Sequence, residues 1–138
     1  MENNTTITVA QEMPQNLGDL YVSFKPETDE QKAALYKAMS QPDRKMSDFI
    51  NTKIKVTDLY IEVVEIADEE TGEMNQLPRV VLFCEDGTTY ASISKGIFNA
   101  IKRLCAVYGM PHWEKPIPLK IIQTTAKNRK FLNLIVEP

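Results

Sequence analysis

The stretch that decides the fold is residues 53–63, KIKVTDLYIEV, where two alternating patterns of apolar side chains meet. Ile54 and Val56 alternate with polar residues, as in a half-buried strand. Residues 59–63 also alternate, but in the opposite parity. A one-residue shift turns every side chain to the other face of a sheet, so the change near Asp58 predicts a β-bulge or bend in one long strand. Small barrels need strands that curl in this way.

Four more strands and a helix are expected after the long strand. The strands are predicted at residues 79–84, 89–94, 117–124 and 131–136. An Asp86-Gly87 turn joins the first two as a hairpin, and an apolar stripe capped by Ser94 predicts a helix over residues 95–108. This order, with the helix between strands three and four, is that of the OB-fold, a five-stranded, partly open Greek-key barrel. We therefore expect a mainly β, α+β fold.

The part of the chain before this barrel is expected to form an N-terminal helical extension. Three of its segments have the pattern of a regular element: a β-prone run at Thr5–Val9, a short strand at residues 20–24 and a helix at residues 31–40. Thr28 and Gln31 have the spacing of a capping box, and Pro42 ends the helix. The predicted organisation is an arm and capped helix over residues 1–51, packed on a barrel over residues 52–138.

Composition favours one soluble domain and leaves the partner open. The chain has 138 residues, of which 43% are hydrophobic and 25% charged, with a net charge of −3. It has neither the ~20-residue apolar run of a membrane helix nor a signal-peptide pattern, so we expect a cytoplasmic protein. Six acidic residues crowd residues 62–73, whereas basic residues outnumber acidic ones after residue 86. With charge so divided, the charge on one face decides the partner, not the total.

Catalytic chemistry is not predicted. His112 is the single histidine, and its loop position is typical of a surface or packing residue. Cys84 and Cys105 are isolated, as reduced core cysteines usually are. The acidic loop lacks calcium-site spacing, and no glycine-rich phosphate loop is present. We therefore predict no catalytic residue, no metal site and no cofactor.

Nucleic-acid binding is better supported, because OB barrels bind single strands with strands two and three and with the loops between strands. Single-strand binders combine aromatic platforms with cations. The candidate residues are Lys53, Lys55, Tyr60, Arg79, Phe83, Tyr90, Lys95, Lys120, Lys127, Arg129 and Lys130. The alternative is that Phe83 and Tyr90 belong to the core and that the lysines are ordinary solvated residues.

Residues 86–97, DGTTYASISKGI, resemble a segment of the small single-stranded DNA-binding proteins of tailed bacteriophages. That family shows a DG–x–x–Y–x–x–x–SK run, then an amphipathic helix, a strand and a final strand, and this chain has each in order over roughly residues 53–136. The matching residues are Tyr90, Ser94 and Lys95, whose role in DNA contact or in structure stays open. The resemblance implies non-sequence-specific binding and protection of single-stranded DNA during phage replication or recombination, without catalysis. It also implies action in the host cytoplasm. Replication proteins and further copies of the chain are additional candidate partners.

A protein-interaction module is the competing hypothesis. The acidic hairpin around Glu69 and Glu70, together with the N-terminal helix, would then bind a host protein or mimic nucleic acid. Affinity for nucleic acid separates the two hypotheses. A small enzyme is a third hypothesis, which lacks a catalytic group.

Overall fold

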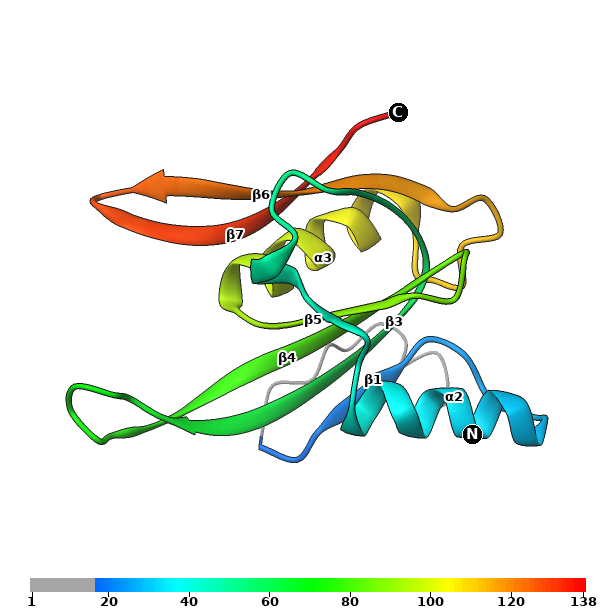
Figure 1. The fold of residues 1–138 in the computed structure, drawn as a ribbon, viewed down its shortest axis with the longest axis horizontal. Coiled ribbons are helices and arrows are strands. Elements are labelled where there is room, and N and C mark those ends of the chain that lie inside the picture. Colours follow the sequence, from blue (N-terminus) through cyan, green and yellow to red (C-terminus); the bar gives the residue numbers. More distant parts are fainter. Residues whose placement is uncertain (1–16) are drawn as a thin grey trace.

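The long strand of the barrel is bent where its apolar pattern changes parity. The protein is described by a computed structural model over residues 17–138, in which β3 (Lys53–Ala67) runs through the centre of the sheet (Figure 1). Its pairing with β4 (Met74–Cys84) shifts register between Val56 and Asp58, so the predicted bulge is confirmed. Ahead of the bulge, residues 53–56 pair with β6 (Ile117–Ala126). The bend therefore lets one strand join both halves of the curled sheet.

The sheet has seven strands in the described residues and forms a curled, mixed half-barrel. Its order is β2-β5-β4-β3-β6-β7, and β1 pairs with β3 outside this path. The remaining strands are β1 (Leu20–Val22), β2 (Arg44–Lys45), β5 (Thr89–Ile93) and β7 (Arg129–Val136). The five predicted strands are all present and lie side by side, while β2 runs parallel to β5 and covers part of its edge. In residues 17–138 no ladder joins β7 to β5 or β2, so the barrel is open on that side.

Two strand boundaries differ from the sequence-based prediction. Residues 74–78, expected to belong to a loop, form the start of β4 because pairing with β3 continues to Ala67 and Met74. β6 and β7 continue to Ala126 and Arg129, which leaves only Lys127 and Asn128 between them. Both turn residues have positive φ, 52° and 65°, as in the two-residue turns that match the twist of a hairpin. The basic turn expected at residues 126–129 is therefore present, at the end of a hairpin longer than predicted.

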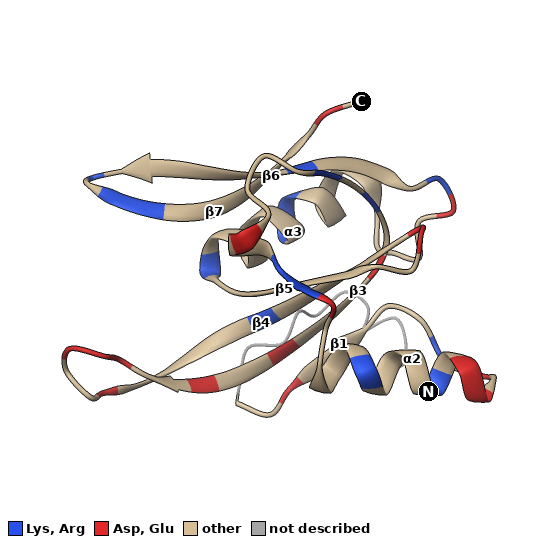
Figure 2. Cartoon of the chain, in the orientation of Figure 1, with Lys and Arg blue, Asp and Glu red and all other residues tan. Residues whose placement is uncertain are grey.

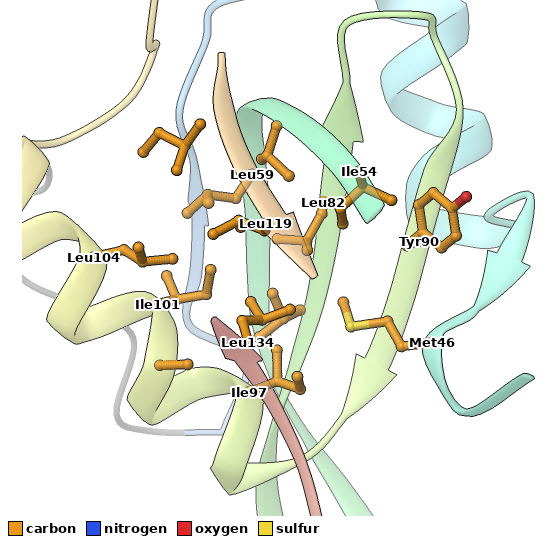
Figure 3. Packing of buried hydrophobic residues seen from close by; sticks show 14 of the residues in the cluster. Met46, Ile54, Leu59, Leu82, Tyr90, Ile97, Ile101, Leu104, Leu119 and Leu134 are labelled. Atoms are coloured by element: carbon orange, nitrogen blue, oxygen red, sulfur yellow. The ribbon is translucent and has the colours of Figure 1, made fainter. Parts of the chain in front are cut away.

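Helix α3 (Lys95–Tyr108) closes one end of the half-barrel, as predicted. Ser94 caps it by accepting a hydrogen bond from the backbone N–H of Ile97. Its buried residues are Ile97, Ala100, Ile101 and Leu104. Figure 3 shows Ile97, Ile101 and Leu104 pointing toward the sheet residues Leu119 and Leu134.

The N-terminal helix packs on the other face of the sheet. Helix α2 (Asp29–Ser40) has the predicted capping box between Thr28 and Gln31. Its Ala38 is 1% exposed and joins a small cluster with Tyr60 and Val81, on the face opposite the main core. The outer face of strands β3 and β4 is thus covered there. The predicted β-prone run at residues 5–9 lies outside the described residues.

The buried carboxylate of Asp58 connects three segments of the chain at the bulge. Asp58, 8% exposed, accepts a hydrogen bond from the Ser23 hydroxyl at 2.8 Å and pairs with His112 Nδ1 at 2.8 Å. The Ser23 hydroxyl in turn accepts from the backbone N–H of Leu59 at 2.9 Å. The single histidine is therefore a packing residue that ties its loop to the bent strand.

Candidate nucleic-acid interface

A groove of about 1150 Å³ lies along the open side of the half-barrel. One wall is the strap, which we define as residues 41–49 between α2 and β3, including β2 and the short 3-10 helix η1 (Met46–Asp48). The end of β5 and the start of α3 form its base, with Leu77 and Arg79 of β4 at one side. The opposite wall is the β6–β7 hairpin, which extends to the same side of the molecule as the β3–β4 hairpin (Figure 1).

The charge in this groove is predominantly positive. Its lining includes five cations from four parts of the chain: Arg44, Lys45, Arg79, Lys95 and Lys130. Figure 2 shows these basic segments on β2, β4, α3 and β7, whereas the acids of the β3–β4 hairpin gather toward its far turn. The lining carboxylates are Asp43 and Asp48. An anionic strand therefore meets an excess of cations here.

One of these two carboxylates is already held by the protein. Asp43 forms an ion pair with Lys37 at 3.1 Å and accepts a hydrogen bond from the backbone N–H of Thr89 at 3.0 Å. The hydrogen bond from Lys37, followed by that from Thr89, lowers the pKa of Asp43. Its charge is thus compensated by the fold and weakens the field in the groove less than a free carboxylate would.

The two groove arginines have fixed positions. The Arg44 guanidinium carbon lies 4.6 Å from the centroid of the Phe49 ring and 5.5 Å from that of Tyr90. Arg44 Nη1 also donates a hydrogen bond to the Tyr90 hydroxyl at 2.7 Å. Arg79 Nη1 donates to the carbonyl of Met39, at the C-terminal end of α2, at 2.8 Å. Each guanidinium keeps further N–H donors for a ligand.

Two phenylalanine rings at the groove were not predicted as site residues. Phe49 lies half-buried on the strap, and Phe131 of β7 is 37% exposed. Arg44 and Lys45 were also missed, because they lie between the predicted helix and the predicted long strand, where no regular element is expected. The sequence does contain a signal: the adjacent cations Arg44 and Lys45 are followed closely by Phe49. Cations together with an aromatic residue are the composition of a single-strand binding surface.

Three of the predicted site residues line the groove, and two more lie beside it. Arg79, Lys95 and Lys130 belong to the lining. Lys127 and Arg129 stand at the turn of the same hairpin as Lys130. The basic cluster, expected at the turn between strands four and five, is carried on the β-hairpin that borders the groove.

The predicted aromatic platforms are buried or partly covered. Tyr60 is 0% exposed beneath α2, donates its hydroxyl hydrogen bond to Glu62, and has a pKa raised by burial and by that bond. Tyr90 is 3% exposed and belongs to the main core. Phe83 is half-buried and packs edge-on against Phe24, with ring centroids 5.3 Å apart. Neither tyrosine ring can stack on a base in this conformation.

The last three predicted residues lie away from the groove and are paired with acids. Lys53 and Lys120 face each other across β3 and β6 and share Glu137, at 3.0 Å and 3.7 Å. The hydrogen bond from Lys53 lowers the pKa of Glu137. Lys55 lies 3.7 Å from Glu85. The structure therefore does not bring these lysines together with the groove cations.

Groups for nucleophilic or metal chemistry are sparse in the region that the structure describes. Burial raises the pKa of the Cys84 thiol to about 12 and that of Cys105 to about 11, which disfavours the thiolate. Residues 17–138 contain no cluster of three His, Cys, Asp or Glu side chains able to hold a metal ion. Among the described helices, none has the length and apolar character needed to span a membrane.

Comparison with known proteins identifies the family of this chain. A family model described as phage single-stranded DNA-binding protein, Phi29 type, matches residues 16–137, and so includes the strap as well as the barrel. No curated protein and no solved structure matches the chain. Because the family match spans nearly the whole sequence, this chain belongs to the Phi29 phage single-stranded DNA-binding protein family.

Proposed function

We propose that the groove between the strap and the β6–β7 hairpin is the surface on which this chain binds single-stranded DNA. As a member of its family, the protein binds single-stranded DNA during phage replication and is not an enzyme. The observation that carries the location is the convergence of Arg44, Lys45, Arg79, Lys95 and Lys130 on one groove that also has an exposed phenylalanine ring, Phe131. Cations follow the phosphate backbone, and aromatic rings stack on bases of any identity.

This chemistry favours a single strand over a duplex. The exposed ring of Phe131 can stack only on a base that is unpaired. We therefore expect tighter binding to a single strand than to a duplex of equal length, with little sequence preference.

The strand order supports an OB-type barrel as the finer description of the fold. The adjacent strands β5-β4-β3-β6-β7, with α3 between the third and fourth of them in sequence, have the arrangement of such a barrel with its last contact left open. We infer that the groove occupies this opening. The face of strands two and three that OB barrels often use is covered here near Val81 by α2. This difference moves the proposed interface to the edge of the sheet.

We also propose five further properties of this chain that are expected from its sequence. They are the division between residues 1–51 and 52–138, a role in recombination, self-association, contact with replication proteins and action in the host cytoplasm.

Two sets of three lysines provide the test of the groove. Lys45, Lys95 and Lys130 line it, whereas Lys53, Lys55 and Lys120 lie elsewhere in ion pairs. Each set is replaced by glutamine, and binding of a fluorescein-labelled oligo-dT is measured by anisotropy at several salt concentrations. Both triple variants lose the same formal charge. The variant of Lys53, Lys55 and Lys120 therefore controls for the loss of long-range attraction between the protein and DNA.

The groove triple variant should bind more weakly, and its log–log salt slope should fall by about 0.7 for each lost phosphate contact, up to about 2 in total. The paired-lysine variant should keep most of the affinity and most of the slope. A larger loss in the paired-lysine variant would move the interface to the surface of β3 and β6 that carries these lysines. An equal loss in both variants would also contradict the proposal.

A further inference from the structure

We propose that Tyr90 is a positioning residue for DNA binding, which acts by holding the guanidinium of Arg44 at the groove. The proposal rests on the assignment of the groove as the single-stranded DNA surface. It gives Tyr90 a role different from the stacking platform expected from the sequence. The ring stays in the core, and only its hydroxyl acts on the groove, through Arg44.

The contacts of Tyr90 place a buried ring under an exposed cation. Tyr90 is 3% exposed, and Figure 3 shows its hydroxyl pointing away from the other labelled core side chains. Arg44 is its partner in the parallel pairing of β2 and β5, and Arg44 itself is exposed. The hydroxyl accepts the Arg44 Nη1 hydrogen bond at 2.7 Å. One arginine N–H is thus directed inward, and the other donors remain for the ligand.

Two aromatic rings complete the support for this guanidinium. Phe49 lies 4.6 Å from the guanidinium carbon and packs edge-on against Tyr90, with ring centroids 5.7 Å apart. An arginine held by stacking and a hydrogen bond loses little rotamer freedom when it binds a ligand, whereas a free arginine loses more. Affinity gained in this way depends on the Tyr90 hydroxyl as well as on the charge of Arg44.

The backbone of the strap is held independently of Tyr90. The Asp43 N–H donates to the Thr89 hydroxyl at 2.9 Å, and the Thr89 N–H donates to the Asp43 carboxylate at 3.0 Å. On the other side of Arg44, Met46 is 0% exposed in the main core. Removing the Tyr90 hydroxyl should therefore free the Arg44 side chain while the strap stays in place.

The test is a double-mutant cycle between Tyr90→Phe and Arg44→Gln, measured with labelled oligo-dT at several salt concentrations. Tyr90→Phe should weaken binding by about three- to tenfold, the effect of one lost hydrogen bond, and should leave the salt slope unchanged. Arg44→Gln should weaken binding and lower the slope by about 0.7. Adding Tyr90→Phe to Arg44→Gln should cause no further loss. Arg44→Lys, which keeps the charge without the planar fork, should match Tyr90→Phe and be non-additive with it.

Tyr60→Phe is the matched control, because Tyr60 is also a buried tyrosine but its hydroxyl partner is Glu62. It should not change DNA affinity. Unchanged affinity in Tyr90→Phe would overturn the proposal, and so would an equal loss in the Arg44→Gln background, which indicates a general structural role. If Arg44→Gln and the groove lysine variant both bind normally, the groove assignment itself fails.

Discussion

Replacing Gly96 with alanine tests how closely α3 lies against β7, and so how the base of the groove is built. Gly96 stands in the first turn of α3 and has no positive φ that would require glycine. At an ordinary position of this kind, alanine stabilises a helix by roughly 0.5–1 kcal/mol relative to glycine. Helix propensity alone therefore predicts a more stable protein.

The packing around Gly96 predicts the opposite effect, a loss of stability. A Cβ atom on residue 96 would lie 2.4 Å from the carbonyl oxygen of Leu132 and 3.2 Å from a ring carbon of Phe131. The first neighbour is backbone of β7, which cannot rotate away as a side chain can. Overpacking of this kind costs about 1–3 kcal/mol. After subtraction of the propensity gain, we expect Gly96→Ala to lower the free energy of unfolding by about 1 kcal/mol, with an upper limit of about 2.5 kcal/mol.

The assay is urea denaturation followed by circular dichroism, with Asn99→Ala as the control. Asn99 is exposed one turn further along α3, where alanine should stabilise the protein by a few tenths of a kcal/mol. DNA affinity of Gly96→Ala should fall as well, because moving β7 displaces Phe131 and Lys130, which line the groove. A Gly96→Ala variant as stable as the parent chain, or more stable, would refute the close approach of helix and strand.

Three further substitutions test the core, a helix cap and the dependence of stability on pH in acid. Ile101→Ala should cost about 2–5 kcal/mol in the same denaturation assay, because Ile101 is 0% exposed, and a loss below ~0.5 kcal/mol would contradict its placement. Thr28→Ala removes the capping hydrogen bond of α2 and should cost about 0.5–2 kcal/mol, whereas Thr28→Ser should cost little. The pKa of Asp43 is lowered by Lys37, so its stabilisation is present above the ordinary carboxyl pKa of 3.8 and is lost as the pH falls through the lower folded value. Asp43→Asn should therefore make stability less dependent on pH below about 4, and an unchanged acid profile would contradict this.

Sequence-based prediction and structure agree best for elements whose signals lie in neighbouring residues. The bulge near Asp58, the capping box at Thr28 and the stripe of α3 all depend on neighbouring residues in the sequence. The DG turn before β5 and the SK pair at the start of α3 likewise stand where the family resemblance places them. Periodicity and capping are properties of short segments, so one sequence is enough to find them.

The sequence by itself thus determined the α+β class, the order of the elements and, through the resemblance, the DNA-binding family. Tertiary structure decided which cations share a surface. Periodicity along a strand or a helix shows that Lys53 and Lys95 can both face solvent, but it does not show that Lys53 is paired with Glu137 while Lys95 lines a groove. Strand β2 of the strap has only two residues, too few for a periodic signal. Its pairing with β5 makes the strap a wall of the groove. Contacts between distant segments arise only when the sheet curls, which is why the groove could not be predicted from residue patterns alone.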